Sequence, residues 1–304
     1  MYCDSPPIKS HSIQRNGALR DISENSHVYQ FGPGRVPVPL WKVPTLISTR
    51  TASIFPGFCE NHDHDLFRSI ESLFDVEDRG HLCLLFYRAL CIELHKKEFS
   101  LHTFELALQQ SKRKNIEHIR AVREGTLKGI SDLNRIREIV ERHLHEGILL
   151  DLSGIIVEFE DHLPFTFTGV FAPFYDFSGG NLRIGTSIYD PWSGIFVFAG
   201  RIGGKNIFFA AGISEAGVQD IERFFSTFLL HHESLRSAYV LNLGLTHLEN
   251  SFFKVSWFDS LAAREKDYIR GKLREGGNFG PMNQYALIPE VKINTARHRR
   301  TISL

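Results

Sequence analysis

The spacing of apolar and polar positions changes twice along this chain. Between residues 66 and 144, apolar residues recur three and four positions apart, which is the spacing of helices that bury one face. This spacing predicts three helices, whose apolar stripes run from Leu66 to Phe74, from Leu82 to Leu94 and from Ile116 to Leu144. The long third stripe is typical of a helical hairpin or bundle, and it is also a candidate seam for a homo-oligomer.

After Gly147 the pattern changes to short runs of β-branched and aromatic residues that Gly, Pro, Asp and Asn interrupt. Such runs predict strands, and they cover residues 148–152, 154–159, 165–171, 194–199 and 206–210. Turn sequences at 178–181 and 203–205 favour an antiparallel sheet. Helices are predicted again at 214–230 and 256–275. We therefore expect an α+β unit with one helical layer on a sheet.

The first 75 residues show weaker periodicity. Residues 27–31 alternate like a short strand, whereas residues 32–57 are rich in Pro and Gly. Each Pro removes a hydrogen-bond donor and restricts the residue before it, so the second segment is predicted to be an extended loop. The whole chain is predicted to be an α+β protein with three domains, at residues 1–75, 76–147 and 148–304.

Composition narrows the class of protein. The chain has 304 residues, of which 42% are hydrophobic and 23% charged, as in an ordinary globular protein. Lys plus Arg and Asp plus Glu both total 35, so nucleic-acid binding would need a local basic surface. Cys83 and Cys91 lie in an apolar helical pattern, which indicates a reducing compartment. Without a run of about eighteen apolar residues or a signal peptide, we expect a cytoplasmic protein that is not membrane-inserted.

The most informative motif is a Cys-x-x-His pair on a loop whose turn contains a glycine. Cys59 and His62 stand at the end of the Pro- and Gly-rich segment, just before the first helical stripe. Structural Zn²⁺ takes four Cys or His ligands, usually as two closely spaced pairs from distant segments. Cys3 is the candidate for the second pair, and its partner would precede Met1 by one residue.

The sequence thus predicts one zinc ion bound by Cys3, Cys59 and His62. The fourth ligand stays open: it is a Cys upstream of the given start, or one of His11, His27, His64 and Cys83. Binding of no zinc at all is the remaining alternative.

These residues resemble a known family. The order of Cys3, a Ser-His-Ser-Ile-Gln segment at 10–14 and a Phe-Cys-x-x-His-Asp segment at 58–63 resembles the zinc-stapled treble-clef form of HNH (ββα-metal) endonucleases. It is also similar to an N-terminal module of uncharacterised bacterial proteins. The resemblance covers residues 1–75, and it implies a metal-dependent nuclease, with bacterial or phage defence as the context.

The resemblance also assigns roles to residues. His11 would be the general base that activates water, and Asp63 or His64 would be the helix-borne ligand of Mg²⁺ or Mn²⁺. Ser10 departs from the family pattern, because these enzymes usually have an Asp or His metal ligand at this position. Two alternatives follow: a zinc-stapled binding or sensing protein without catalysis, and a ribonuclease of another family.

That other family is suggested by the helical region. Arg88 and His95 are similar to the loose Arg-x(4 to 6)-His pattern of HEPN ribonucleases, although Arg113 with His118 and Arg137 with His143 fit the pattern as well. The chain has no P-loop, dinucleotide fingerprint, Gly-x-Ser-x-Gly elbow or His-Glu-x-x-His helix, which disfavours the enzyme classes that depend on them. The basic residues 297–300 are expected to form a flexible tail.

Overall fold

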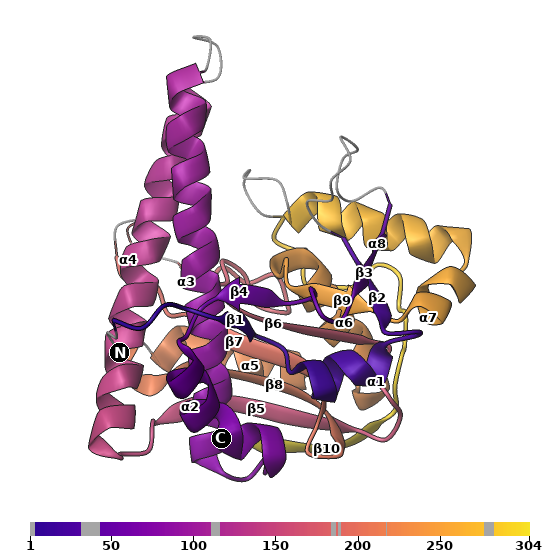
Figure 1. The fold of residues 1–304 in the computed structure, drawn as a ribbon. Helices are drawn as coiled ribbons and strands as arrows, with labels where there is room; N and C mark the ends of the chain where they lie inside the picture. The colour runs from indigo at the N-terminus through magenta and orange to yellow at the C-terminus, as the bar shows by residue number, and fades with distance from the viewer. Residues whose placement is uncertain are drawn as a thin grey trace.

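The computed structural model describes residues 4–31, 43–110, 116–183, 187, 190–216, 218–276 and 283–304. A sheet of eight strands forms the centre of the molecule, in the order β10-β5-β8-β7-β6-β9-β2-β3 with every pair antiparallel (Figure 1). Its strands are β2 (His27–Gln30), β3 (Thr45–Ser48), β5 (Leu152–Phe159), β6 (Phe165–Phe171), β7 (Ile195–Ile202), β8 (Lys205–Ile213), β9 (Ser251–Phe253) and β10 (His298–Ser303). A separate pair joins β1 (Lys9–His11) to β4 (Ile54–Pro56).

Helices cover both faces of the sheet. The first face packs against α2 (Glu60–Ser72), α3 (Arg79–Gln110) and α4 (Ile116–Glu146). The second face packs against α5 (Val218–Leu229), α6 (Arg236–His247), α7 (Val255–Ser260) and α8 (Ala263–Gly276). A short helix, α1 (Arg20–Ile22), lies near the N-terminus. The expectation of one helical layer is therefore wrong, because the region at 60–146 supplies a second one.

The two-sided burial explains the continuous apolar runs. Along β7, Phe196 and Phe198 belong to the core under α3, whereas Ile195 and Val197 belong to the core on the opposite face. Phe86 of α3 reaches the sheet, with its ring centroid 5.5 Å from that of Phe196. A strand with both faces buried needs apolar residues at every position rather than at alternate ones.

Several predicted elements have the expected place. The helix at 116–146 and the strand at 165–171 match closely, and the strand at 27–30 is also present. Gly203 and Gly204 have φ angles of 57° and 77°, which makes the turn between β7 and β8 a type I′ hairpin. The antiparallel sheet and the mixed α+β class are thus confirmed.

Other predictions need correction. The segment at 32–57 contains β3 and β4 rather than only loop, and residues 32–42 lie outside the described residues. Residues 148–151 are not part of a strand, and the two runs predicted at 148–159 contribute to one strand, β5. The helix predicted at 256–275 is broken into α7 and α8, and α6 was not predicted at all.

The C-terminal basic segment is an edge strand and not a flexible tail. Strand β10 pairs with β5. Arg300 donates to both carboxylate oxygens of Glu158, at 2.8 and 2.7 Å, and Arg297 makes a similar bidentate contact with Asp161. Arg297 and Arg300 are therefore used within the fold.

Strand pairing and core packing cross the domain boundaries predicted at residues 75 and 147. Strands β2 and β3 come from the first predicted domain, yet they extend the sheet that the third supplies. One core cluster contains residues of all three segments, among them Phe67, Phe86 and Phe209. None of the helices in the described part of the chain has a stretch long and apolar enough to cross a membrane.

Candidate functional site

Apart from Cys3, the residues of the zinc and nuclease predictions lie in one small unit, the ββα unit, which consists of β1, β4 and α2. Although β1 and β4 are far apart in sequence, they pair antiparallel, with Ser10 opposite Phe55 and His11 opposite Ile54. The N–H of Ile8 extends this pairing by donating to the carbonyl of Phe58 at 2.7 Å. The helix begins at Glu60, so it follows the second strand almost at once.

A tight aromatic turn connects β4 to the helix. A Cβ atom on Gly57 would lie 2.2 Å from Cε2 of Phe55, so only glycine allows this ring to fold against the loop. The ring of Phe58 then contacts those of Phe55 and Phe67, with centroids 6.0 and 4.9 Å apart. These contacts fix the entry angle of α2, and hence the position of its first turn.

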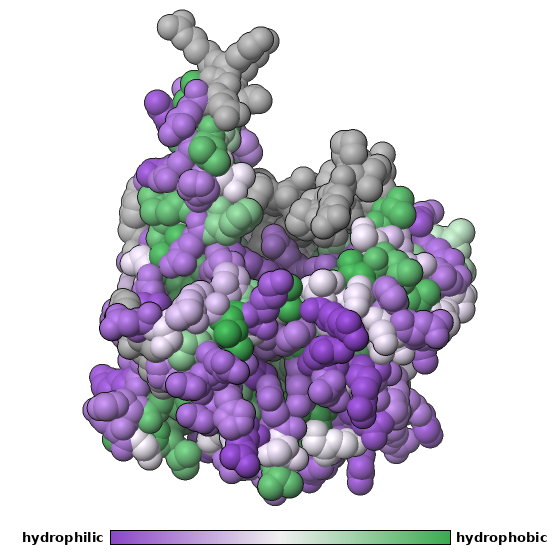
Figure 2. Space-filling view, viewed as in Figure 1, coloured by the Kyte–Doolittle hydropathy of each residue, from purple (hydrophilic) through white to green (hydrophobic). Residues whose placement is uncertain are grey.

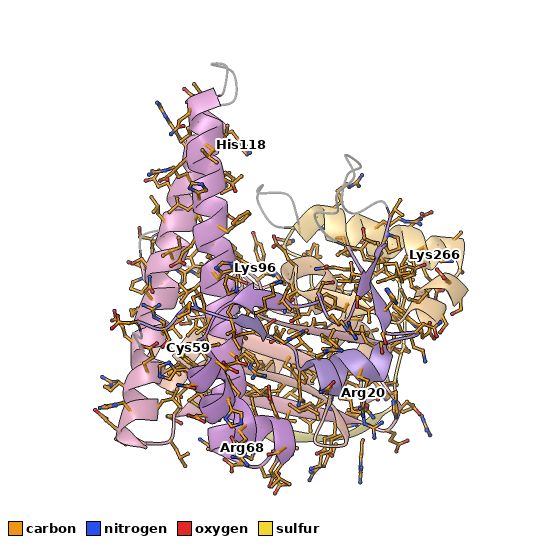
Figure 3. The ribbon with its side chains drawn as sticks, viewed as in Figure 1. Arg20, Cys59, Arg68, Lys96, His118 and Lys266 are labelled. Carbon is orange, nitrogen blue, oxygen red and sulfur yellow. The ribbon has the colours of Figure 1, made fainter. Side chains whose placement is uncertain are left out.

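Cys59 is the N-cap of α2 (Figure 3). Its Sγ accepts a hydrogen bond from the backbone N–H of His62 at 3.4 Å, and it lies 3.4 Å from Nδ1 of the same residue. Two ligands of a tetrahedral zinc ion, one sulfur and one nitrogen, are about 3.6 Å apart when the usual bond lengths are used. The pair therefore fits two neighbouring positions of a zinc shell.

The other proposed zinc ligands are placed less favourably. Cys3 lies outside the described residues. Nδ1 of His27 bonds the carbonyl of Asn25, and His64 is exposed and bonds Asp65 at 2.9 Å. Cys83 is buried in α3, and burial raises the pKa of its thiol to about 12. Within the described ranges, no group of three or more Cys, His, Asp or Glu side chains is placed to hold a metal ion.

His11 ends β1 and is half-buried. It donates a hydrogen bond to the backbone carbonyl of Thr49. Its Nε2 is buried and has no hydrogen-bond partner among the described residues.

Three charged groups act on the imidazole of His11. Burial is the main reason that its pKa lies below the ordinary value of 6.5, and the positive charges of Arg15 and Arg88 lower it further. The hydrogen bond to Thr49 and the carboxylate of Asp63 oppose this shift. A neutral imidazole with a free lone pair can accept a proton from water near neutral pH.

Several buried polar atoms of this unit, and one of the neighbouring helix α3, lack a described partner. Besides Nε2 of His11, the buried atoms without a partner among the described residues include Oγ of Ser10, Oδ1 of Asp63 and Nε of Arg88. Of these residues, Ser10 and Arg88 have side chains that are almost fully buried. Leaving a buried polar atom unpaired costs about 1–3 kcal/mol, so each of these atoms is a candidate contact for a ligand.

Arg88 connects the unit to the rest of the fold. Its guanidinium donates to Oε1 of Glu71 at 2.7 Å and lies over the ring of Phe67, 4.0 Å from the centroid. Together with Ser12 and Arg201 it also lines a small pocket between α2, α3 and β7. Arg88 thus brings a positive charge to the site from α3.

A hydrogen-bond network holds the end of β1. The hydroxyls of Ser12 and Ser53 bond each other, and Nδ2 of Asn250 donates to Oγ of Ser12 at 2.9 Å. The backbone N–H of Ile13 donates to Oγ of Ser53 at 2.8 Å. The loop before β9 is therefore tied to the residue that follows His11, which limits the movement of the imidazole.

The structure places Asp63 close enough to influence His11 electrostatically, whereas the side chain of His64 is 64% exposed. Of the two alternatives for the helix-borne ligand, Asp63 therefore has the better position. The sequence reasoning missed Arg15 and the carbonyl of Thr49. The position of Arg15, four residues after His11, was a signal for the first, but only the fold reveals the second.

No family model matches this chain, and neither curated proteins nor solved structures give a match. The chemistry of the ββα unit must therefore be argued from its own residues. They supply a candidate base, a carboxylate and a sulfur–nitrogen pair suited to zinc, and Arg15 and Arg88 add positive charge from neighbouring segments.

Proposed function

We propose that this protein is a metal-dependent nuclease whose active site is the ββα unit. The observation that carries this proposal is the state of His11, whose buried Nε2 is left without a hydrogen-bond partner among the described residues. The carboxylate of Asp63 and the guanidinium groups of Arg15 and Arg88 act on the same imidazole. This combination suits attack by water on a phosphodiester.

Each residue then has a distinct role. Nε2 of His11 takes a proton from water, and Arg15, which is exposed, attracts the phosphate. Oδ1 of Asp63 would hold Mg²⁺ or Mn²⁺, which when bound supplies positive charge to the scissile phosphate. Cys59, His62 and Cys3 would hold a structural zinc ion that ties the N-terminal segment to the start of α2.

The substrate is a nucleic acid, and the biological context that we propose is bacterial defence, including defence against phage. The context rests only on the resemblance of residues 1–75 to modules of bacterial proteins. We also propose that the protein acts in the cytoplasm, since Cys83 and Cys91 are free thiols in a helix and Cys83 is buried.

Cleavage assays on single- and double-stranded DNA and RNA, with Mg²⁺ or Mn²⁺, test the nuclease. We expect His11→Ala to lower the rate by about 100-fold or more, because general-base catalysis contributes about 10²–10⁴. Asp63→Ala should also lower the rate, with partial recovery at high metal concentration. His64→Ala is the matched control on the same helical turn, and it should leave the rate unchanged.

Elemental analysis tests the zinc ion separately. We expect about one zinc per chain in the wild type, lost in Cys59→Ser and kept in Cys83→Ala. The second variant is a suitable control because its cysteine is a buried thiol in α3. Zinc below a tenth of an equivalent in the wild type would contradict the structural zinc site.

Burial of Ser10 favours the second candidate function, a zinc-stapled binding or sensing protein. Its side chain is 1% exposed and cannot supply the ligand that related nucleases have there. Full zinc content without cleavage of any substrate would support this alternative.

The HEPN-like ribonuclease is a weaker proposal. Arg88 is buried against Phe67 and Glu71, while the ring of His95 lies 6.2 Å from that of Phe55. Both side chains therefore face the ββα unit. Cleavage of RNA that survives His11→Ala but is lost in His95→Ala would support this reading.

A further inference from the structure

Strand β10 forms one end of the eight-stranded sheet, with β5 as its neighbour. It is the lower edge of the sheet in Figure 1, and polar residues predominate on the surface there (Figure 2). Ladder hydrogen bonds hold an edge strand on one side only, so such strands open more easily than central ones. The side-chain contacts of β10 therefore contribute to how firmly it is held.

A β-bulge in β10 gives two of its side chains a common partner. His298 lies opposite Phe159 of β5, but Arg300 lies opposite Glu158, so one residue between them is extra. Residues three apart point to opposite faces of a regular strand, and the bulge brings His298 and Thr301 to the same face. Both side chains bond the same guanidinium group of α6.

That guanidinium belongs to Arg236, which is only 6% exposed. It donates to Nε2 of His298 at 2.6 Å and to Oγ1 of Thr301. Because an arginine side chain has donors but no acceptor, Nε2 of His298 is the acceptor and the imidazole is neutral. The ring proton is then on Nδ1, which lies 3.3 Å from Oε2 of Glu233.

Two charged groups of opposite sign face this imidazole. Arg236 comes from α6, and Glu233 comes from the short 3₁₀ helix Glu233–Leu235 before it. Strand β5, all of which is described, presents Phe159 to the imidazole and its one charged residue, Glu158, to the opposite face. The side chain of Glu233 is 62% exposed, so water screens its attraction more than the repulsion from the buried guanidinium.

Protonation of His298 would change this contact from a bond into a repulsion. Nε2 would become a donor that faces the N–H group of Arg236. The hydrogen bond would be lost, and two positive charges would be in contact on a buried surface. Burial and the charge of Arg236 accordingly lower the pKa of His298 from its ordinary value of 6.5, and Glu233 opposes this shift only in part.

The other contacts of the segment do not titrate in the same range. Two bidentate ion pairs hold it, Arg300 with Glu158 and Arg297 with Asp161. Hydrogen bonds from the arginines lower the pKa of Asp161 to about 2 and that of Glu158 below its ordinary value of 4.5. Both carboxylates therefore stay ionised between pH 7.5 and pH 5, and a change in the opening of β10 there needs another group.

We propose that His298 and Arg236 form a pH-sensitive latch, which holds β10 against the sheet near neutral pH and weakens at mildly acidic pH. Opening of β10 leaves the edge of β5 unpaired, and such an edge is a template for a strand of another chain. The latch depends on neither zinc nor nuclease activity.

Linkage fixes the direction and the limit of the effect. The closed latch favours neutral His298, so its contribution is full above pH 6.5 and is lost as pH falls toward the lowered pKa. At pH 5 the equilibrium constant for opening of β10 rises by at most about 30-fold.

Amide hydrogen exchange of the full chain tests the latch. Each rate is divided by the intrinsic rate at the same pH, which gives a protection factor. Between pH 7.5 and pH 5, the protection factors of β10 should fall several-fold, up to about 30-fold. In His298→Gln they should change little, because the amide oxygen accepts from Arg236 and does not titrate. His64→Gln is the matched control: this histidine is 64% exposed in α2, and its loss should leave the fall unchanged.

Nuclear magnetic resonance of the His298 ring gives a second test that needs no variant. At pH 7.5 the nitrogen shifts should show the proton on Nδ1, and the titration midpoint should lie below 6.5. A proton on Nε2, or a midpoint at or above 6.5, overturns the latch. An equal fall in protection of β10 in the wild type and in His298→Gln also overturns it, as does protection in the wild type that does not change with pH.

Discussion

The sheet and the ββα unit differ in how fully their buried polar side chains are paired, although Oδ1 of Asn206 in β8 also lacks a described partner. In the sheet, the buried carboxylate of Glu158 has two partners, with Arg300 at 2.7 Å and Lys205 at 3.3 Å. In the ββα unit and its contact with α3, Ser10, His11, Asp63 and Arg88 contribute four of the twelve buried side-chain atoms that lack a partner in the described part of the chain. Pairing of this kind stabilises the sheet, whereas the unpaired atoms in and beside the ββα unit can bind a ligand.

This difference indicates where selection for function acts on the fold. Unpaired buried atoms persist in natural proteins mainly where a ligand, a proton or a water uses them. The sheet, with apolar residues on both faces, provides enough stability to tolerate them. Substitutions in the ββα unit are therefore expected to lower activity more than stability. Substitutions in the sheet and its covering helices are expected to lower stability first.

The largest expected effect is on a fragment of residues 148–304. This fragment keeps β5 to β10 but loses β2, β3 and the layer of α2, α3 and α4. Phe196 and Phe209, which are 0% exposed in the full chain, would then face water. We expect no cooperative thermal transition by circular dichroism and strong binding of a hydrophobic dye. A sharp transition like that of the full chain would instead establish the predicted boundary at 147.

The apolar pattern predicted the regular helices and strands of this fold but missed others. The strand at 165–171 and the helix at 116–146 were predicted because their apolar spacing is regular. Helix α6 was missed because it is buried on all sides at residues 236–246, so it shows no contrast between faces. Strand β4 was missed because it ends in Pro56, a residue that argues against a strand.

The site was predictable only in part, for a different reason. Local motifs identified Cys59, His62 and His11, because ligand spacing and family patterns are short-range signals. The contribution of Arg88 depends on the packing of α3 against α2, and that of Thr49 on a turn preceding β4. Contacts between distant segments leave no trace in one sequence, so these residues required the structure.

The turn before α2 gives the next largest effect. Gly57→Ala places a methyl group against the ring of Phe55, which must move, and overpacking of this kind costs about 1–3 kcal/mol. Gly125→Ala is the matched control in α4, where a Cβ would meet nothing within 4 Å. It should stabilise the protein by about 0.5–1 kcal/mol. Urea titration measures both, and equal effects would contradict the tight turn.

Protonation of His247 in α6 tests the stability of the sheet and its helices separately from that of the ββα unit. Burial lowers the pKa of His247 from 6.5 to about 3, and its ring stacks on Phe171 at 4.4 Å. The neutral form is favoured by folding, so its contribution is full above pH 6.5 and is lost as pH falls toward 3. At pH 5 the loss is at most about 2 kcal/mol.

The variant His247→Phe keeps the stacked ring but cannot titrate. Between pH 7 and pH 5, the unfolding free energy of the wild type should fall by up to about 2 kcal/mol more than that of this variant. Parallel pH profiles would show that His247 becomes protonated without disturbing the fold.

The smallest effect tests the contrast between partnered and unpartnered atoms directly. Ser10 and Ser12 are both buried, at 1% and 6% exposure, but only Ser12 has described hydrogen-bond partners, in Ser53 and Asn250. Removing an unpaired hydroxyl relieves part of its desolvation cost, so Ser10→Ala should raise the unfolding free energy by about 0.5–1 kcal/mol.

Ser12→Ala should instead lower the unfolding free energy, because it leaves Nδ2 of Asn250 without its partner. A loss of about 1–2 kcal/mol is expected in the same urea titration. If the free hydroxyl of Ser10 serves the reaction, Ser10→Ala also slows cleavage while it stabilises the fold. If both serine variants destabilise the protein alike, then the hydroxyl of Ser10 has a partner in solution, and the contrast between the two regions does not extend to this residue.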